Sequence, residues 1–327
     1  NAIRNLFTTQ KFADIFVYEQ PDSAGVRVIV NLREFPRLRQ VAFKGNDKVK
    51  KEDLQEAFPQ QVGQPVNPAR LQRDLEKIRA LYQDKGYYNV EVSTDSSRVD
   101  AANLQDLVVT IREGKKVKAE TIRFEGNERI SADALRGVMK QKTGGFLRSG
   151  AFKPKQFEGD RENIVNLYRD RGFLDAAILD VRQDLRADRE RMDILIRVSE
   201  GEQYTVGDIN WAENTKFDDK AIAERVTMAK GQIFSEGDYQ QMLDGLRALY
   251  YDNGYIYATV EPRREIKDRA VNLALTFYEG REAHIRDIRV VDNARTYDRV
   301  VLRELSIFPG DVFSQSKILR SQRDIMQ

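Results

Sequence analysis

The chain has 327 residues, of which 41% are hydrophobic and 32% are charged, and its 54 Lys and Arg residues nearly balance its 52 Asp and Glu residues. This composition supplies folded cores, and a net charge of +2 argues against a nucleic acid as the main partner. The absence of cysteine excludes disulfide bonds and zinc–thiolate sites, and a single histidine, His284, excludes a multi-histidine metal site. From length alone we expect about two or three domains.

Three short landmarks recur in the same order along the chain. A strand-like run ends at Asn46, Asn127, Asn214 and Asn293, which lie 81, 87 and 79 residues apart. A Gly-aromatic pair recurs at Gly86-Tyr87, Gly172-Phe173 and Gly254-Tyr255. A Glu-Gly pair recurs at Glu113-Gly114, Glu200-Gly201 and Glu279-Gly280. Because three independent landmarks keep one period, the sequence predicts tandem structural repeats of about 80 residues.

Each repeat has the same predicted elements. A short strand ends at the Asn, and a first helix follows at Lys51–Phe58, Ser131–Lys140 and Asp218–Met228. A longer second helix ends at the Gly, and its apolar residues recur at helical spacing, as in Leu71, Leu75, Ile78, Leu81 and Tyr82. Two alternating runs then form a hairpin. This order predicts an α+β fold of tandem β-α-α-β-β repeats, each a three-stranded sheet covered on one face by two helices.

The same register divides the chain into units. Residues 1–35 form the C-terminal half of a first unit, with a hairpin at Phe12–Tyr18 and Val26–Leu32. Residues 36–114, 115–201 and 202–280 form three complete units, and residues 281–327 form the N-terminal part of a fifth. In that part we expect a strand at Arg286–Val291, a helix at Asp298–Ser306 and a second helix capped by Ser314. Both ends of the sequence fall within predicted helices, so we expect the native protein to continue beyond them.

The sequence contains no pattern typical of an enzyme. The acidic pairs Glu52-Asp53 and Asp218-Asp219 open predicted helices, where carboxylates stabilise the positive end of the helix dipole. His284 lies in a predicted strand without a partner motif, and Gly144-Gly145 lacks the Lys-Ser/Thr of a phosphate-binding loop. We therefore predict no catalytic residue, no metal site and no cofactor.

The repeat resembles the POTRA domain, the polypeptide-transport-associated module of outer-membrane biogenesis proteins. The clearest stretch of the resemblance comprises Phe124-Glu125-Gly126-Asn127, Gly172-Phe173 and Glu200-Gly201. The first unit departs from the family pattern at Lys11-Phe12 and Glu34-Phe35-Pro36, and the fourth at Ala212-Glu213-Asn214. With at least five units represented, the array is similar to that of the outer-membrane β-barrel assembly factors.

The resemblance implies a location and a role. It implies that the chain lies in the periplasm, attached to the outer membrane through a C-terminal β-barrel that this sequence does not include. It also implies a docking and scaffold region of the β-barrel assembly machinery. The implied partners are unfolded outer-membrane β-barrel proteins, accessory lipoproteins and the chain's own barrel, with no nucleic acid. Two alternatives remain open: the POTRA region of another outer-membrane translocation or assembly barrel, and a passive periplasmic spacer or scaffold in a cell-envelope complex.

The family places the second strand of each unit at a sheet edge, where unpaired backbone groups can accept another strand. These edges map to Tyr87–Thr94, Phe173–Val181 and Tyr255–Pro262, and the second of them is the main candidate. Pro262 lacks an N–H group and is expected to blunt its edge. The candidate partner-binding residues are Tyr87, Val90, Val92, Phe173, Leu174, Ala177, Ile178, Val181, Tyr255, Tyr257 and Val260.

The third unit has an insertion, and short joints separate the units. From Asn127 to Gly172 is 45 residues, against 40 from Asn46 to Gly86. We assign the extra residues to a loop at 143–150 that carries Phe146 and Leu147, which is either a binding loop or a harmless insertion. The candidate hinges between units are Pro36, Gly114, Gly201 and Gly280, and such short joints predict a semi-flexible array.

Overall fold

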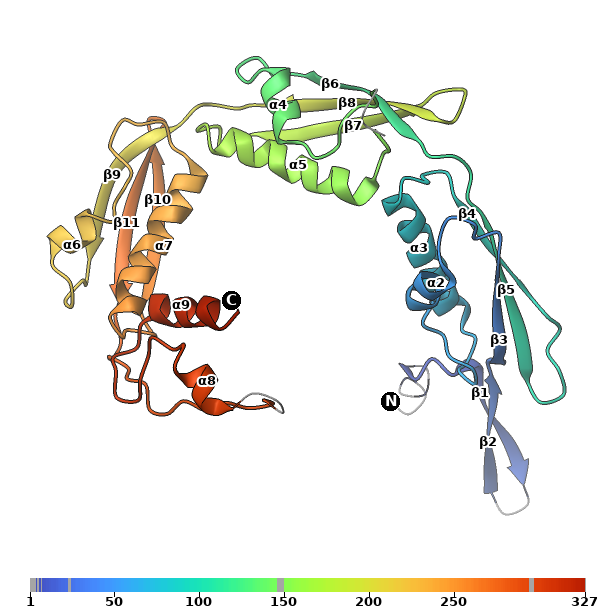
Figure 1. Ribbon diagram of the computed structural model, residues 1–327. Coiled ribbons are helices and arrows are strands. Elements are labelled where there is room, and N and C mark those ends of the chain that lie inside the picture. The colour runs from blue at the N-terminus through green and yellow to red at the C-terminus, as the bar shows by residue number, and fades with distance from the viewer. Residues whose placement is uncertain are drawn as a thin grey trace. The chain divides into compact units, whose positions relative to one another are not determined.

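A computed structural model describes residues 4, 6, 8–22, 25–145, 150–293 and 297–326 (Figure 1). The backbone forms two compact units, and the boundary between them runs through the third repeat. The first unit contains the N-terminal hairpin and the second repeat. The second unit contains the fourth repeat and the C-terminal helices.

The first unit begins with strands β1 (Phe12–Asp22) and β2 (Gly25–Glu34), which pair antiparallel. A sheet of order β3-β5-β4 follows, built from β3 (Arg37–Lys44), β4 (Glu91–Ser96) and β5 (Leu104–Arg112). Strand β5 pairs parallel with β3 and antiparallel with β4. Helices α2 (Lys51–Ala57) and α3 (Pro68–Asp84) bury apolar side chains in one core with this sheet, among them Leu54, Ile78, Leu107 and Val109.

The third repeat has the same topology. Its sheet has the order β6-β8-β7, with β6 (Lys118–Glu125), β7 (Ala177–Leu185) and β8 (Arg191–Ser199). Helices α4 (Ala132–Val138) and α5 (Pro154–Arg169) lie between β6 and β7 in the chain. The side chain of Gln141 closes the base of the inserted loop, because its amide donates to the carbonyls of Gly150 and Ala151 (3.4 and 3.2 Å).

The second unit contains a sheet of order β10-β11-β9, built from β9 (Thr205–Ala212), β10 (Thr259–Lys267) and β11 (Ala270–Tyr278). Helix α6 (Asp219–Ala223) is short, and α7 (Glu236–Asp252) lies alongside β10 and β11 (Figure 1). Helices α8 (Asp298–Leu302) and α9 (Gln315–Met326) follow. The core residues of α7 are Tyr239, Met242, Leu243, Leu246 and Tyr250.

Local sequence sets the starts of the long helices as expected. The side chain of Asn67 accepts hydrogen bonds from the N–H groups of Ala69 and Arg70 (2.9 and 3.3 Å), and Pro68 occupies the first helical position. Ser235 accepts from the N–H of Asp238 (3.1 Å) at the start of α7. The predicted fold class, an α+β array of β-α-α-β-β repeats, is confirmed.

The predicted strand at Arg286–Val291 is wrong. That segment is not extended in a sheet, and a single bridge between His284 and Val312 is formed nearby. In the complete repeats the first strand pairs with the third, as β9 does with β11. No strand follows α9 in the described part of the chain, so this segment has no ladder partner.

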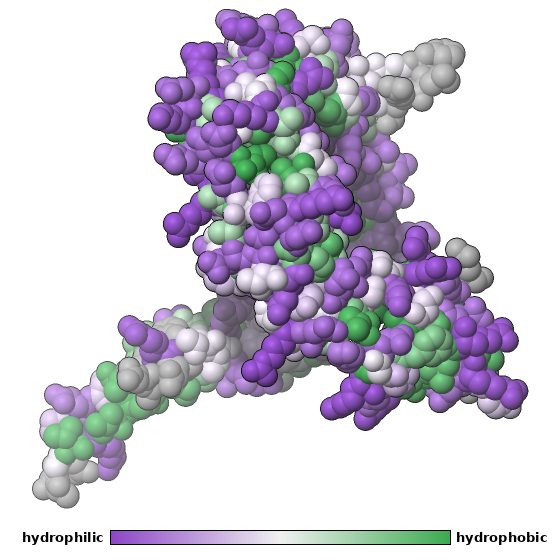
Figure 2. All heavy atoms as spheres, turned by 90° about the vertical axis from the view of Figure 1, so that its left-hand side faces the viewer, coloured by the Kyte–Doolittle hydropathy of each residue, from purple (hydrophilic) through white to green (hydrophobic). Residues whose placement is uncertain are grey.

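The N-terminal hairpin presents an apolar face to solvent. Its outward valines and leucine are between 42% and 65% exposed, namely Val17, Val26, Val28, Val30 and Leu32. The corresponding residues of β5 are buried beneath α2 and α3, whereas no helix of the described chain packs on the hairpin in this way. Elsewhere, hydrophilic side chains cover most of the surface visible in Figure 2, in keeping with the high charged content.

Candidate functional site

The second strand of each complete repeat lies at the edge of its sheet. The central strands are β5, β8 and β11, so β4, β7 and β10 each pair on one side only in the described chain. The predicted edge position is confirmed, but the predicted strand starts are wrong. The four residues after each Gly-aromatic glycine form a turn, in which Ala176 N–H donates to Phe173 O (3.2 Å) and Ala258 N–H to Tyr255 O (3.0 Å). Each strand therefore begins five residues after its glycine.

The predicted binding residues divide between strand and turn. In the strands, Ala177 is exposed and Ile178 and Val181 are half-buried, whereas Val92 and Val260 are buried toward the helices. In the turns, Val90 and Phe173 are buried, and Tyr87, Leu174 and Tyr255 are half-buried. Tyr257 is exposed. The loop candidates Phe146 and Leu147 lie outside the described residues. Only part of the predicted set can thus meet a partner through its side chains.

Strand β7 offers the longest uninterrupted edge of the three. Strand β4 has six residues, whereas β7 and β10 have nine each. In β10, Pro262 lies opposite Leu275 without a break in register. Because proline has no N–H group, its nitrogen must face away from β11, and that edge lacks a donor. Strand β7 contains no proline, so each of its residues keeps its N–H group.

The alternation of a strand then assigns the donors of β7. In an antiparallel pair, alternate residues direct both backbone groups to the partner strand, and the residues between them direct both groups outward. The N–H of Arg186, one residue after β7, donates to the carbonyl of Arg191 (2.8 Å), so Arg186 faces β8. By this alternation Arg182 and Asp184 also face β8, and Val181, Gln183 and Leu185 present N–H and C=O to the open edge. The side chain of Leu179 is 63% exposed, so an apolar contact adjoins these groups.

A polar network holds the sheet of the third repeat in register beside this edge. The Arg186 guanidinium lies 2.7 Å from the Asp193 carboxylate, and Thr121 donates to the same carboxylate (2.6 Å). These hydrogen bonds, that from Arg186 above all, lower the pKa of Asp193 to about 2. Asp193 therefore remains charged at neutral pH and links β8 to β6 and to the end of β7.

A buried tyrosine–glutamate contact recurs in the three complete repeats. The Tyr168 hydroxyl donates to Glu200 Oε1 (3.0 Å), and the same bond joins Tyr82 to Glu113 and Tyr250 to Glu279 (2.8 Å each). Glu200 also accepts from the N–H groups of Arg129 and Ile130 in the turn after β6. Sequence reasoning treated the tyrosine as core and the glutamate as a landmark, and missed the pair. Their joint recurrence in every complete repeat was the available signal.

The predicted hinges lie beside ordered backbone contacts. At each joint, a residue near the start of one repeat donates its N–H to the carbonyl of the Gly-aromatic glycine in the repeat before it. The three bonds are Val117 to Gly86 (3.1 Å), Tyr204 to Gly172 (2.8 Å) and Ala283 to Gly254 (2.8 Å). Gly114, Gly201 and Gly280 lie a few residues before these donors, and the carbonyl of Pro36 accepts from Val66 N–H (2.7 Å). The semi-flexible behaviour of the joints stays a prediction.

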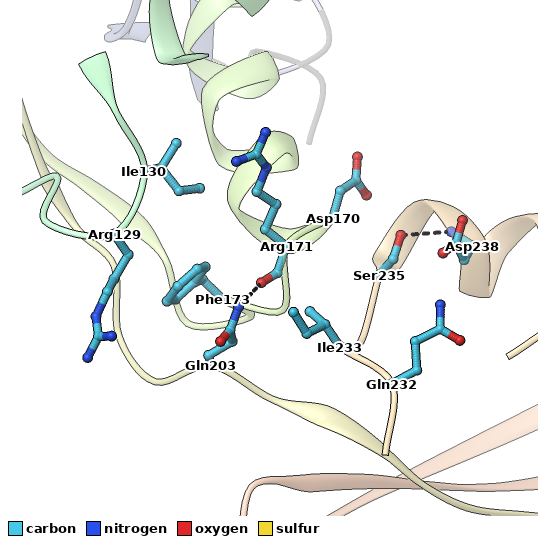
Figure 3. A pocket seen from close by; sticks show the side chains of 10 residues that line it. All are labelled: Arg129, Ile130, Asp170, Arg171, Phe173, Gln203, Gln232, Ile233, Ser235 and Asp238. Atoms are coloured by element: carbon cyan, nitrogen blue, oxygen red, sulfur yellow. Dashed lines mark hydrogen bonds between the residues drawn. The ribbon is translucent and has the colours of Figure 1, made fainter. Parts of the chain in front are cut away.

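A cavity of about 610 Å³ lies in the second unit, where the third repeat meets the fourth (Figure 3). Its apolar wall is formed by Ile130, Phe173 and Ile233. The amide of Gln203 donates to the carbonyl of Arg171 (2.9 Å) at one side. The remaining lining residues are polar: Arg129, Asp170, Gln232, Ser235 and Asp238.

Comparison with known families decides what these repeats are. The POTRA model, described as surface antigen variable number repeat, matches residues 36–114, 117–201, 204–280 and 283–327. The chain belongs to the POTRA family. The exact boundaries between the units, which were taken from the spacing of the sequence landmarks, stay a prediction.

The POTRA repeats of this chain are similar to curated proteins named outer membrane protein assembly factor BamA. The protein from Neisseria meningitidis serogroup B is 27% identical over 335 residues, which cover 99% of this chain and 41% of that protein. The protein from Nitratidesulfovibrio vulgaris is 25% identical over 329 residues, covering 98% and 41%. The chain spans about two fifths of the length of these relatives. The crystal structure of Haemophilus influenzae BamA POTRA3-5 aligns with a TM-score of 0.44 at 19% identity, covering 74% of this chain and 95% of that chain.

One departure from the POTRA pattern has a backbone explanation. The residue before the landmark Asn has a positive φ in each copy, at Gly45, Gly126, Glu213 and Asp292. At Gly126 an added Cβ would meet the carbonyl oxygen of Val198 at 2.1 Å, so glycine is required there. The fourth repeat keeps the same turn with a glutamate at φ 68°.

No group of three or more His, Cys, Asp or Glu side chains in the described part of the chain is placed to hold a metal ion. None of its helices is both long enough and apolar enough to cross a membrane. His284 is exposed, and its Nε2 atom lies 3.6 Å from the Glu282 carboxylate.

Proposed function

We propose that this chain is part of a periplasmic docking and scaffold region of the outer-membrane β-barrel assembly machinery. In this proposal it binds unfolded β-barrel proteins, in part by strand addition, and carries sites for accessory lipoproteins and for its own membrane barrel. Membership of the POTRA family and the shared name of the relatives support the assembly role. The observation that supports strand addition is the open edge of β7.

Strand addition suits a receptor for many unfolded clients. The contacts are backbone hydrogen bonds, so the client needs β-forming residues rather than one particular sequence. Strand β7 provides nine residues without proline, an open edge in the described chain and one exposed apolar side chain, Leu179. The two equivalent edges are less favourable, because β4 is short and β10 contains Pro262.

A proline in the outward row of β7 tests this function. Gln183→Pro removes one outward donor and leaves the bonds to β8 intact, as Pro262 does in β10. We expect weaker binding of an unfolded outer-membrane β-barrel protein, measured by crosslinking or fluorescence anisotropy, with unchanged circular dichroism.

The control is Gln183→Ala, which removes the side-chain amide and keeps the backbone N–H; its binding should equal that of the unaltered chain. The reverse substitution, Pro262→Gln, should add binding at β10. If Gln183→Pro and Gln183→Ala bind the client equally well, β7 does not receive a strand, and the chain acts as a spacer or docks clients elsewhere.

A further inference from the structure

Strand β7 carries charges of alternating sign along one of its faces. Asp180, Arg182 and Asp184 are exposed, and Arg186 continues the same spacing just after the strand. Among the described residues Arg186 has a side-chain partner in Asp193 of β8, whereas the side chains of the other three have none. Unmatched charges therefore stand in a row at the open edge.

The opposite face of β7 is largely apolar. Arg182 and Asp184 line one small cavity with Asp193, which belongs to the row of β8 that alternates with its buried residues. By the alternation of a strand, the half-buried Val181 and Leu185 lie on the other face of the sheet, toward the helices. A strand added at this edge thus meets a charged row on one face and apolar side chains on the other.

The sequence of β7 is complementary to itself in one antiparallel arrangement, centred on Gln183. The outward backbone groups of Gln183 then meet those of its own symmetry mate, and those of Val181 meet those of Leu185. On the charged face every residue meets its opposite, because Arg182 faces Asp184 and Asp180 faces Arg186. The twofold axis forms each of these pairs twice.

The charges also select this register against its neighbours. Sliding the second copy by two residues in one direction places Arg182 opposite its own mate and Asp180 opposite Asp184. Sliding it in the other direction places Asp184 opposite its mate and Arg182 opposite Arg186. Like charges directly opposite each other are destabilising, so both neighbouring registers are disfavoured.

The equivalent edges lack one part of this arrangement. Strand β10 has the same alternation of charge, in Glu261, Arg263, Glu265 and Lys267, but Pro262 removes an N–H group from its outward row. Strand β4 has six residues, and its charged residues, Glu91 and Asp95, are both acidic. Only β7 combines a complete outward row with alternating charge.

We infer that β7 pairs antiparallel with β7 of a second copy of this chain, which joins two three-stranded sheets into one. The occupant follows from the complementarity of the strand with itself in charge, apolar contact and backbone groups. The inference uses the same edge as the proposed function but does not depend on a client. A client strand and a second copy would exclude each other at this edge.

Sedimentation equilibrium of the full 327-residue chain, at concentrations up to about 1 mM, tests the pairing. We expect reversible dimers. Arg182→Asp and Asp184→Arg each place like charges opposite each other twice, so each variant should dimerise about tenfold more weakly. An equimolar mixture of the two variants restores opposite charges at every pair and should dimerise as the unaltered chain does. Arg263→Asp is the matched change in β10 and should have no effect.

A single cysteine locates the contact, because the chain has none of its own. Gln183→Cys lies on the twofold axis and should be crosslinked to its mate by a short bismaleimide. Asp180→Cys should not, because its mate lies about 20 Å away along the paired strands. Crosslinking of both variants at equal rates would overturn the arrangement.

Three further results would overturn the inference: no dimer up to about 1 mM, undiminished dimerisation of Arg182→Asp and Asp184→Arg, or no recovery in their mixture. Client binding separates this inference from the proposed function. A chain that binds an unfolded β-barrel protein at β7 but never dimerises contradicts the self-pairing alone. A chain that dimerises through β7 but binds no client there contradicts strand addition alone.

Discussion

The hydroxyl of Tyr168 lies 3.0 Å from Oε1 of Glu200, and both residues are buried. The same carboxylate receives two backbone N–H groups of the turn after β6. One glutamate thereby joins the long helix, the end of the central strand and the first turn. The Glu-Gly landmark is one end of this contact, and the tyrosine at its other end lies four residues before the Gly-aromatic glycine, so both recur with one period.

Removal of this hydroxyl should destabilise the third repeat. Tyr168→Phe removes one of the donors to a buried carboxylate oxygen, which keeps the N–H of Ile130, and we expect a loss of about 1–2 kcal/mol in the free energy of unfolding. Native-state hydrogen exchange of the α5 amides measures it, since the repeats need not unfold together. Tyr257→Phe is the matched control, because Tyr257 is 71% exposed. Equal losses in the two variants would show that the Tyr168 contact contributes nothing specific.

Alkaline pH should weaken all three contacts. Burial, together with the hydrogen bond to glutamate, raises the pKa of Tyr82, Tyr168 and Tyr250. The folded pKa exceeds the unfolded value of about 10, so this stabilisation is complete below that pH and is lost as pH rises above it. Of the 13 tyrosines, these three should ionise only as the chain unfolds. A tyrosinate absorbance titration that reaches all 13 with unchanged circular dichroism would contradict this.

Acid should act on the fourth repeat through Glu279. Burial raises the pKa of Glu279, but hydrogen bonds from Thr215, the Lys216 N–H and Tyr250 outweigh it, and the net pKa is lowered. A lowered folded pKa stabilises the fold above the unfolded value of about 4.3, and this stabilisation is lost as pH falls. Thermal unfolding between neutral and acid pH should show a smaller pH dependence in Glu279→Gln than in the unaltered chain. An identical dependence in both would assign the acid sensitivity to other groups.

The turn after β6 should tolerate no side chain at Gly126. An added Cβ would meet the Val198 carbonyl oxygen at 2.1 Å at a φ of +83°, so Gly126→Ala should cost more than about 2 kcal/mol of unfolding free energy. Gly63 has a similar φ of +85° with open space around it, and Gly63→Ala should cost only the conformational strain, about 1 kcal/mol. Denaturant unfolding of both variants compares them, and equal costs would remove the steric explanation.

The spacing of the recurring landmarks predicted most of the fold, because each landmark marks a place where the backbone must turn or a helix must end. A turn before Asn127 and a helix end at Gly172 are local features, and their order specifies the elements between them. The start of the second strand was mispredicted because Phe173 N–H bonds back to the carbonyl of Tyr168 (3.0 Å). That bond extends the helix end, and the alternation of apolar residues does not reveal it.

The remaining features of the site depend on contacts between distant segments. Tyr168 and Glu200 lie 32 residues apart in the chain, so their pairing required the folded third repeat. The pocket likewise needs Phe173 and Ile233 from two repeats, and no single motif contains both. The absent strand at Arg286–Val291 shows the converse, since a strand-like sequence without a partner strand stays unpaired.

Strand addition at β7 is tested most directly by single-amide hydrogen exchange of the full chain, with and without a saturating unfolded β-barrel protein. The N–H groups of Val181, Gln183 and Leu185 face the open edge, by alternation from the Arg186–Arg191 bond. We predict that these three amides become at least about tenfold more protected in the complex, while those of Arg182 and Asp184, which face β8, change little. Unchanged exchange at all three outward amides in the saturated complex would contradict strand addition at this edge.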